Sequence, residues 1–207
     1  YFANIAGFPN LLTLDMGCTS TDVAMCRDGS QTFSRETTLG YFPIKVPSID
    51  VRSVGAGGGS IAHVPEITNA LRVGPESAGA EPGPASYGLG GTNPTVTDAN
   101  VVLGYIRPGP LADGEVEVSA ELAAQAVGGQ IAGPLDVDLL SAAHGIHRIA
   151  NAQTMRALRE VSTERGRDPR DFALIAFGGA GPIHAAGLAR ELGIGRVVVP
   201  PLPGLIS

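Results

Sequence analysis

The sequence predicts an α/β fold in which a mixed sheet is flanked by helices. Three observations carry this prediction. Short apolar strands and a hairpin signal come first, long helical patterns follow, and a strand, a glycine-rich turn, a helix and another strand come last. A strand–helix–strand unit makes its two strands parallel, whereas a hairpin pairs antiparallel strands, so this order gives a mixed sheet.

Composition limits the class of protein. The chain has 207 residues, a hydrophobic fraction of 43% and a charged fraction of 16%, so it can bury a core and does not look disordered. Its net charge is −6, Lys45 is its only lysine, and it contains no basic run, which excludes a typical nucleic-acid binder. We treat residues 1–207 as one domain.

Membrane insertion and secretion have little support. No apolar run approaches the roughly 20 residues of a membrane span. Cys18 and Cys26 could form one disulfide, but we interpret them as two reduced thiols of a cytoplasmic protein, because no secretory signature is present. The sequence starts at Tyr1 without Met and stops at Ser207 without a closing element, so we expect a piece of a longer polypeptide.

The first half of the chain reads mainly as strands. Leu11–Leu14 is an apolar run that ends in Asp15 and predicts a buried strand. The segment Arg27–Ser30 has the Asp-Gly signal of a hairpin. Further strands are expected over residues 21–26, 31–36, 49–54 and 61–64. Residues 74–97 carry four prolines and six glycines and predict a long ordered loop.

The second half reads mainly as helices. A short helix is expected at 98–103 and a longer one at 119–131, with Ser119 as its N-cap. An apolar stripe at helical spacing predicts the longest helix over 138–165, ended by Gly166. The last elements are expected to be a strand at 172–177, a turn at 178–182, a helix at 183–192 and a strand at 196–199.

The segment 15–22 is the leading candidate for a ligand site. A strand that ends in Asp-x-Gly and continues with Thr, Ser, Thr and Asp places backbone N–H groups and hydroxyls at one turn, which suits an anion. Asp15 or Asp22 could hold a hydrated Mg²⁺. The alternative is an ordinary β-turn, because these residues are also turn formers. Cys18 lies in the turn and is a candidate reactive thiol.

Two more glycine-rich turns, 55–60 and 178–182, interrupt the predicted strands. The second joins a strand to a helix, so a flat ligand could lie against its backbone near the helix N-terminus. It is neither a P-loop nor the spaced glycine motif of dinucleotide folds. Tight packing of strand on helix explains the second turn equally well. A bend where two strands cross could explain the first turn, but a phosphate or substrate contact is preferred there because two similar turns occur in the same chain.

The remaining polar candidates have simple structural alternatives. His144 and His147 share a helix face at a spacing that a metal could use, but a structural pair is the preferred interpretation. His63 and His184 lie beside glycine-rich turns. Asp98 could act on a ligand or could cap the helix that follows it.

Taken together, these segments resemble the hydantoinase A/5-oxoprolinase family. The resemblance extends in order over nearly the whole chain. It is carried by residues 15–23, 54–62, 73–84, 94–100 with Leu103-Gly104, and 177–182 with His184-Ala185. The nucleotide-binding core of this family is similar to that of actin, Hsp70 and the sugar kinases, which implies a ribonuclease-H-like, actin-like ATPase half-domain.

The resemblance implies an enzyme that uses ATP and Mg²⁺ to hydrolyse a cyclic amide, such as a hydantoin or 5-oxoproline. ATP would phosphorylate the amide oxygen before water attacks the carbon. Asp15 and Asp98 would act in catalysis, and Asp15 and Asp22 would contact the metal. The implied ATP-binding set is Asp15, Gly17, Thr19, Thr21, Gly57, Gly58, Gly59, Ser60, Gly178, Gly179 and Gly181.

Three departures from the family pattern leave alternatives open. Cys18 stands where the pattern has Gly, and Ser86 stands where it has Cys. The first of the two phosphate turns, with its N-terminal half-domain, is absent, so we expect that half upstream or on a partner subunit, and an oligomer overall. A non-catalytic scaffold domain and a subunit of an ATP-dependent ketone carboxylase are the two alternative functions.

Overall fold

The computed structural model describes residues 5, 7–34, 37–39, 42–44, 46–111 and 114–206. The chain divides into two compact units. Unit 1 comprises residues 1–15, 22–54 and 155–207, and unit 2 comprises residues 16–21 and 55–154. The expectation of a single domain over 1–207 stays a prediction.

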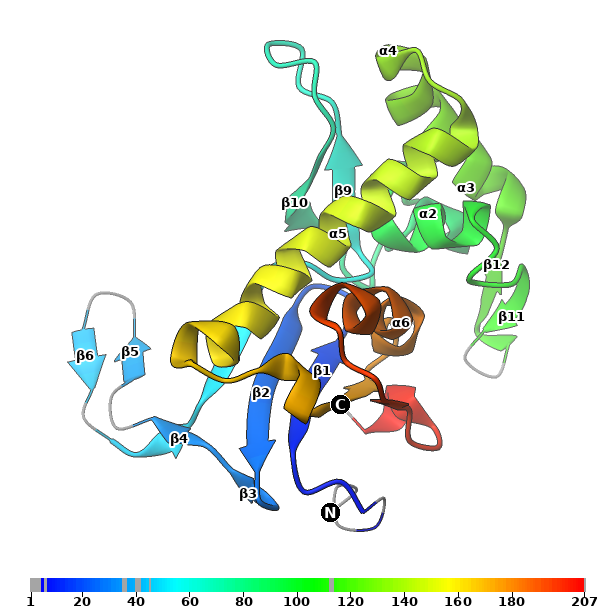
Figure 1. Ribbon diagram of the computed structural model, residues 1–207. Coiled ribbons are helices and arrows are strands. Elements are labelled where there is room, and N and C mark those ends of the chain that lie inside the picture. Colours follow the sequence, from blue (N-terminus) through cyan, green and yellow to red (C-terminus); the bar gives the residue numbers. More distant parts are fainter. Residues whose placement is uncertain are drawn as a thin grey trace. The chain divides into compact units, whose positions relative to one another are not determined.

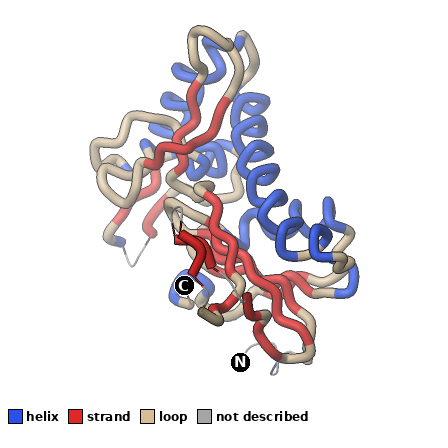
Figure 2. Tube along the Cα trace, turned by 90° about the vertical axis from the view of Figure 1, so that its left-hand side faces the viewer, coloured by secondary structure: helices blue, strands red, loops and turns tan. Residues whose placement is uncertain are grey.

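Unit 1 is built on the mixed sheet that the sequence predicts (Figure 1). Its strand order is β14–β13–β1–β2–β3, with β8 also paired to β2. The strands are β1 (Leu11–Met16), β2 (Thr21–Arg27), β3 (Ser30–Gln31), β8 (Val51–Val54), β13 (Ala173–Phe177) and β14 (Val197–Val198). β13 runs parallel to both β1 and β14, whereas β2 and β3 are antiparallel. Figure 2 shows these strands side by side.

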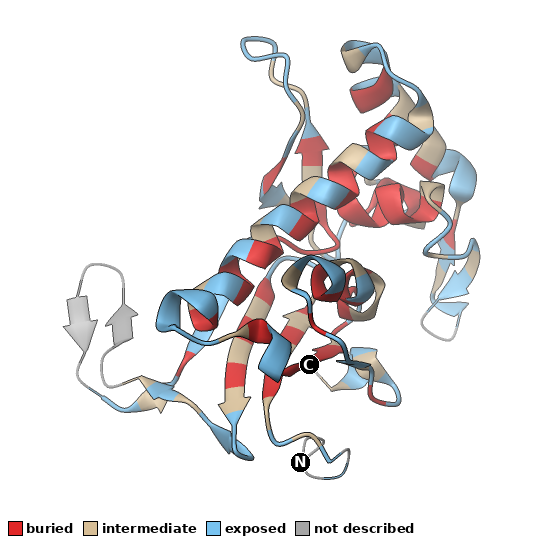
Figure 3. Ribbon diagram, viewed as in Figure 1, coloured by how far each residue is buried: buried red, intermediate tan, exposed pale blue. Residues whose placement is uncertain are grey.

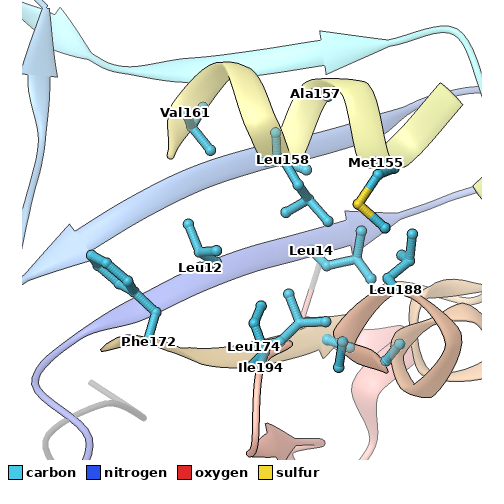
Figure 4. Packing of buried hydrophobic residues seen from close by; sticks show 14 of the residues in the cluster. Leu12, Leu14, Met155, Ala157, Leu158, Val161, Phe172, Leu174, Leu188 and Ile194 are labelled. Carbon is cyan, nitrogen blue, oxygen red and sulfur yellow. The ribbon is translucent and has the colours of Figure 1, made fainter. Parts of the chain in front are cut away.

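The core of unit 1 lies between one face of this sheet and two helices. The helices are α5 (Leu139–Val161), which begins in unit 2, and α6 (Gly181–Leu192). Leu12 and Leu14 of β1 and Leu158 of α5 are fully buried in one apolar cluster (Figure 4). In β1 and β2 buried residues alternate with half-buried ones, and in Figure 3 α5 is buried along one side only. The predicted strands and the predicted helical stripe both bury apolar side chains, and the alternation in the strands follows from their two-residue period.

Small ribbons extend unit 1 beyond the sheet. β4 (Phe33–Ser34) pairs with β7 (Ser48–Ile49), and β5 (Thr37–Leu39) pairs with β6 (Phe42–Ile44). The single strand expected at 31–36 is therefore divided, because Thr32 lies between β3 and β4; residues 35–36 are outside the described part. The strand expected at 49–54 breaks at Asp50, whose buried carboxylate pairs with Arg165.

Unit 2 consists of a hairpin, two short helices, a ribbon and the first part of α5. β9 (Ser60–His63) pairs antiparallel with β10 (Arg72–Ser77), and β11 (Gly109–Leu111) pairs with β12 (Val116–Val118). The helices are α2 (Val96–Val102) and α3 (Ala120–Val127), which continues through a π-turn at 128–132 into α4 (Gly133–Leu135). Within the described residues, no helix combines the length and apolar character needed to cross a bilayer.

The loop predicted over 74–97 is partly wrong. Its first residues extend β10, which tolerates Pro75 because the pairing with β9 shifts register between Val73 and Ser77. Residues 85–87 form a short 3₁₀ helix. The β11–β12 ribbon was not predicted either, because its strands are three residues each and too short for a periodic signal.

Candidate functional site

The Asp15 turn joins two neighbouring strands. β1 ends at Met16, β2 begins at Thr21, and Gly17 donates its N–H to the carbonyl of Ser20 at 3.0 Å, which closes the connection. The residues Cys18, Thr19 and Ser20 are exposed. In the described part of the chain their backbone N–H groups donate no hydrogen bond. The turn therefore presents consecutive unused donors, as an anion-binding nest does.

Thr21, in contrast, is fully buried, and its hydroxyl donates to the carbonyl of Ala56 at 2.5 Å. This hydrogen bond fastens the first turn to the second glycine-rich turn within unit 2. The hydroxyl of Thr21 thus has a partner within the protein, and the expectation that Thr21 binds phosphate stays a prediction. Thr19 remains exposed and stays a candidate.

The second glycine-rich turn also serves the scaffold. Gly58 and Gly59 donate their N–H groups to the carbonyls of Gly17 and Cys18 at 2.9 and 2.7 Å. Residues 56–60 are all buried, and the N–H of Gly57 donates to the hydroxyl of Ser60. The donors of Gly57, Gly58 and Gly59 are thus used inside the protein. These hydrogen bonds hold the neighbouring turn at Gly17 and Cys18 in place, and the assignment of these glycines and of Ser60 to ATP stays a prediction.

Close approach, and not a ligand, explains why residue 57 is glycine. A Cβ on Gly57 would lie 2.4 Å from the carbonyl oxygen of Cys18. A Cβ on Gly59 would lie 2.6 Å from the Cys18 sulfur. Both distances are far below van der Waals contact, so a side chain at either position would separate the two turns.

Cys18 fits its position, although the family pattern has glycine there. Positive φ angles among the described non-glycine residues occur at four positions, and Cys18 is not one of them, so its Cβ causes no backbone strain. Its thiol donates to the carbonyl of Gly79 at 3.0 Å. Burial raises the pKa of the Cys18 thiol, and a hydrogen bond from the Gly59 backbone opposes this only in part. The geometry therefore favours a structural thiol over a reactive thiolate. Cys18 and Cys26 are both free thiols.

Unit 1 brings Asp15 and the third glycine-rich turn to one edge of its sheet. β1 and β13 are parallel, and Asp15 pairs in register with Phe177. Gly178 follows directly, with φ of +79° and its N–H bonded to the carbonyl of Pro203 at 2.9 Å. α6 then begins at Gly181. The carboxyl edge of a parallel strand pair beside a helix N-terminus is where open α/β sheets bind ligands.

This third turn has room that the second turn lacks. Gly179 is exposed, and a Cβ built on it would meet nothing within 4 Å. His184, in the first turn of α6, is buried and thus belongs to the packing of the helix. The assignment of Gly178, Gly179 and Gly181 to adenosine stays a prediction.

The metal candidates are carboxylates without a preformed cage. Asp22 is half-buried in β2 and accepts a short hydrogen bond from the hydroxyl of Ser53. Among the described residues, no group of three or more His, Cys, Asp or Glu side chains is arranged to hold an ion. One or two carboxylates outside such a cage fit Mg²⁺, which keeps several waters and binds largely through phosphate. The assignments of Asp15 and Asp22 stay predictions.

Asp98 is a structural residue. It is fully buried, and its carboxylate accepts hydrogen bonds from the N–H groups of Ala85, Ser86 and Thr95 and from the hydroxyl of Thr95, at 2.7–3.2 Å. Thr95 in return accepts from the Asp98 N–H, which completes a capping box on α2. Of the two alternatives, capping is therefore supported by the geometry, and the catalytic assignment of Asp98 stays a prediction.

His147 is likewise a structural residue and not a metal ligand. It is buried, with Nδ1 2.8 Å from the amide oxygen of Asn100 and Nε2 3.1 Å from the amide nitrogen of Asn151. Both ring nitrogens are therefore occupied, whereas His144 is exposed. Burial lowers the pKa of His147, and the nearby His144 lowers it further. His63 is exposed at the end of β9.

Ser86 carries an unsatisfied group that was not predicted. Its hydroxyl oxygen is buried and has no hydrogen-bond partner among the described residues, although its backbone N–H binds Asp98. The departure from the family pattern at this position was the available signal in the sequence. That departure does not by itself indicate a buried hydroxyl without a partner.

The whole chain matches one known protein family. The sequence model of the hydantoinase/oxoprolinase family matches residues 1–207. The chain belongs to this family. The resemblance inferred from the sequence is thereby confirmed.

Individual relatives agree with this assignment. The chain is 46% identical to caprolactamase subunit alpha of Pseudomonas jessenii over 94% of its own length and 28% of that subunit. It is 42% identical to the acetophenone carboxylase gamma subunit of Aromatoleum aromaticum over 93% of its length and 26% of that subunit. The chain thus spans less than a third of these relatives.

A solved structure confirms the fold. The crystal structure of the ATP-dependent caprolactamase from Pseudomonas jessenii matches 97% of this chain with a TM-score of 0.89 and 45% identity, and the match covers 29% of that chain. The predicted α/β fold, with a mixed sheet and flanking helices, is therefore confirmed.

Proposed function

We propose that this chain supplies the ATP-binding side of an enzyme that hydrolyses a cyclic amide. The observation that carries the proposal is the exposed turn at Cys18–Ser20, whose backbone donors are unused and which begins three residues after Asp15 in the chain. Family membership and the similarity to a caprolactamase subunit, an enzyme whose name denotes a cyclic amide, support the choice of reaction. ATP is supported by the similarity to a structure described as ATP-dependent.

In the proposed reaction the amide oxygen attacks the terminal phosphorus of ATP, and ADP leaves with the electron pair of the broken P–O bond. The amide oxygen then carries phosphate, which makes it a leaving group and makes the carbon electrophilic. Water adds to this carbon to give a tetrahedral intermediate, and the carbon–nitrogen bond then breaks as the nitrogen takes up a proton and leaves as the amine. A second water hydrolyses the resulting acyl phosphate to a carboxylate and inorganic phosphate. Unused N–H groups at the turn stabilise charge on the transferred phosphate.

Asp15 and Asp22 are the residues that we propose for Mg²⁺. When bound, the ion would neutralise phosphate charge and polarise the transferred group. Asp15 is half-buried in β1, one residue before the end of the strand, so the sheet fixes its backbone. Thr19, on the exposed part of the turn, is proposed to contact phosphate through its hydroxyl.

A ketone carboxylase subunit is the second candidate function. It is favoured by the 42% identity to the acetophenone carboxylase gamma subunit. Both functions need ATP, and they differ in the group that receives the phosphate. Relatives named as subunits also support a partner subunit or oligomer for the full-length protein. The scaffold alternative loses its argument from Cys18, because that residue fits the turn without positive φ.

Phosphate release by the full-length protein tests the proposal. We expect ATP hydrolysis to depend on hydantoin, 5-oxoproline or caprolactam, and not on a ketone with bicarbonate. Asp15→Asn should lower this turnover at least about 100-fold, the order of effect found when one group that stabilises transition-state charge is removed from an active site. Glu191→Gln, which changes an exposed carboxylate on α6, is the matched control. Stimulation by the ketone alone would select the carboxylase instead, and no nucleotide binding by folded protein would refute both.

A further inference from the structure

Two neighbouring cavities lie at the edge of the unit 1 sheet opposite the one that carries Asp15. A cavity of about 300 Å³ is lined by the segments that precede β1, β13 and β14, and a neighbouring one measures about 450 Å³. The two cavities share Asn10, Asp171 and Phe172. Asn10 and Asp15 are at opposite ends of β1, roughly 16 Å apart at about 3.3 Å per residue. The two cavities are therefore separate from the Asp15 edge.

The lining of these cavities is basic, although the protein is acidic. Four arginines, namely Arg27, Arg167, Arg170 and Arg196, face two aspartates, Asp168 and Asp171. The lining carries an excess of positive charge, whereas the whole chain has a net charge of −6. We call these four arginines and the two cavities the arginine pocket.

Two of the charged side chains that line the pocket, Arg170 and Asp168, already form an ion pair with each other. Arg170 donates from Nε and Nη2 to the Asp168 carboxylate at 2.6–3.0 Å. These hydrogen bonds lower the pKa of Asp168 to about 2, so its charge is present at neutral pH and is neutralised by Arg170. Arg27 pairs with Asp28 at 3.5 Å, but both side chains are more than half exposed, and such pairs are weak.

The charges of the other two arginines, Arg167 and Arg196, are available to an anion. Within the described ranges, neither Arg167 nor Arg196 forms an ion pair. The Arg196 guanidinium lies 5.5 Å from the centre of the Phe8 ring. This stacking orients the planar group and leaves its N–H edge free to donate to a planar or tetrahedral oxyanion.

We infer that the arginine pocket binds a small anion that carries phosphate or carboxylate groups. Guanidinium groups match the oxygen geometry of both groups and bind them through paired hydrogen bonds. A cavity near 300 Å³ is at the lower end of the range for small-molecule sites, so it suits an anion of a few atoms to the size of a tricarboxylate. This site does not depend on the proposed nucleotide site.

Calorimetry on the intact chain tests the inference, with inorganic phosphate and citrate as separate probes in a low-salt buffer. We expect at least one probe to bind, and the two titrations decide between phosphate and carboxylate. Arg167→Gln and Arg196→Gln should each raise the Kd at least about tenfold, the effect of losing a charge-assisted hydrogen bond. Arg190→Gln is the matched control, because Arg190 is exposed on α6 of the same unit and does not line the pocket.

Two further measurements distinguish the arginine pocket from simple charge attraction and from the nucleotide site. Arg196→Lys keeps the charge but loses the planar fork, so binding should weaken; unchanged affinity would overturn the assignment. Saturating Mg-ATP should leave the titration unchanged, and displacement by ATP would place the anion at the nucleotide site instead. Binding of neither probe by folded protein, or an equal loss in Arg190→Gln, would also overturn the inference.

Discussion

The two glycine-rich turns at 55–60 and 178–181 look alike in the sequence and differ in the structure. In the first, residues 56–60 are buried and the N–H groups of Gly57, Gly58 and Gly59 are used within unit 2. In the second, Gly179 is exposed with open space beside it. Glycine density therefore identifies places where backbone lies close to something, but it does not say whether that partner is protein or ligand.

The largest expected effect distinguishes these two turns directly. Gly57→Ala places a Cβ 2.4 Å from a backbone carbonyl and should lower the free energy of unfolding by about 3 kcal/mol, the upper range for overpacking. Gly179→Ala is the matched control and should change it by less than about 0.5 kcal/mol. Urea denaturation followed by circular dichroism measures both. Equal effects would mean that the first turn is not a packed junction.

The second-largest loss of stability is expected at Asp98, because it caps α2, the helix that contacts the buried turn through Thr97. The N–H of Thr97, one residue before Asp98, donates to the carbonyl of Gly58 at 2.8 Å. Asp98→Asn replaces one acceptor oxygen with a donor that faces other donors, so we expect a loss of about 2 kcal/mol in the free energy of unfolding. Asp138→Asn, at an exposed cap on α5, should lose less. If Asp98→Asn lost no more stability than Asp138→Asn, Asp98 would not have the structural role assigned to it.

Substitution of Ser86 should change the free energy of unfolding by a smaller amount and should stabilise the protein. Its buried hydroxyl has no partner in the described part of the chain, so Ser86→Ala removes an unsatisfied group and should raise the free energy of unfolding by about 1 kcal/mol. Thr95→Ser keeps the capping hydroxyl beside it and serves as a control for disturbance of this region. Thermal denaturation measures the change, and destabilisation by Ser86→Ala would indicate that a bound water satisfies the hydroxyl.

The last prediction concerns pH. Burial holds the pKa of His147 below its ordinary value of 6.5 in the folded protein, whereas the unfolded chain binds the proton at about 6.5. The unfolded state therefore binds more protons below pH 6.5, and stability should fall as the pH drops through that value. The urea midpoint should decrease between pH 7.5 and pH 5.5, and this decrease should be smaller in His147→Gln than in the parent protein. The exposed control His63→Gln, at the end of β9, should keep the parent's decrease in the urea midpoint, and an unchanged decrease in His147→Gln would assign the effect to another group.

Element types and family membership could be determined from the sequence alone. The apolar run Leu11–Leu14, the Asp-Gly signal of the hairpin and the long apolar stripe before Gly166 are local patterns. They survive in the structure because burial of one face follows directly from periodicity. The order of the glycine-rich segments was likewise enough to identify the family. Short ribbons such as β11–β12 were not predictable, because three residues carry no period.

Only the tertiary structure showed which polar residues are already hydrogen-bonded within the protein. Thr21, Gly58 and Asp98 all have the right chemistry for phosphate or metal, yet long-range hydrogen bonds bury each of them in the scaffold. Thr19 has the same chemistry and remains exposed in the same turn. Residue type sets what a side chain or an N–H group can bind, but whether that group is already bound depends on residues tens of positions away, and no local pattern records them.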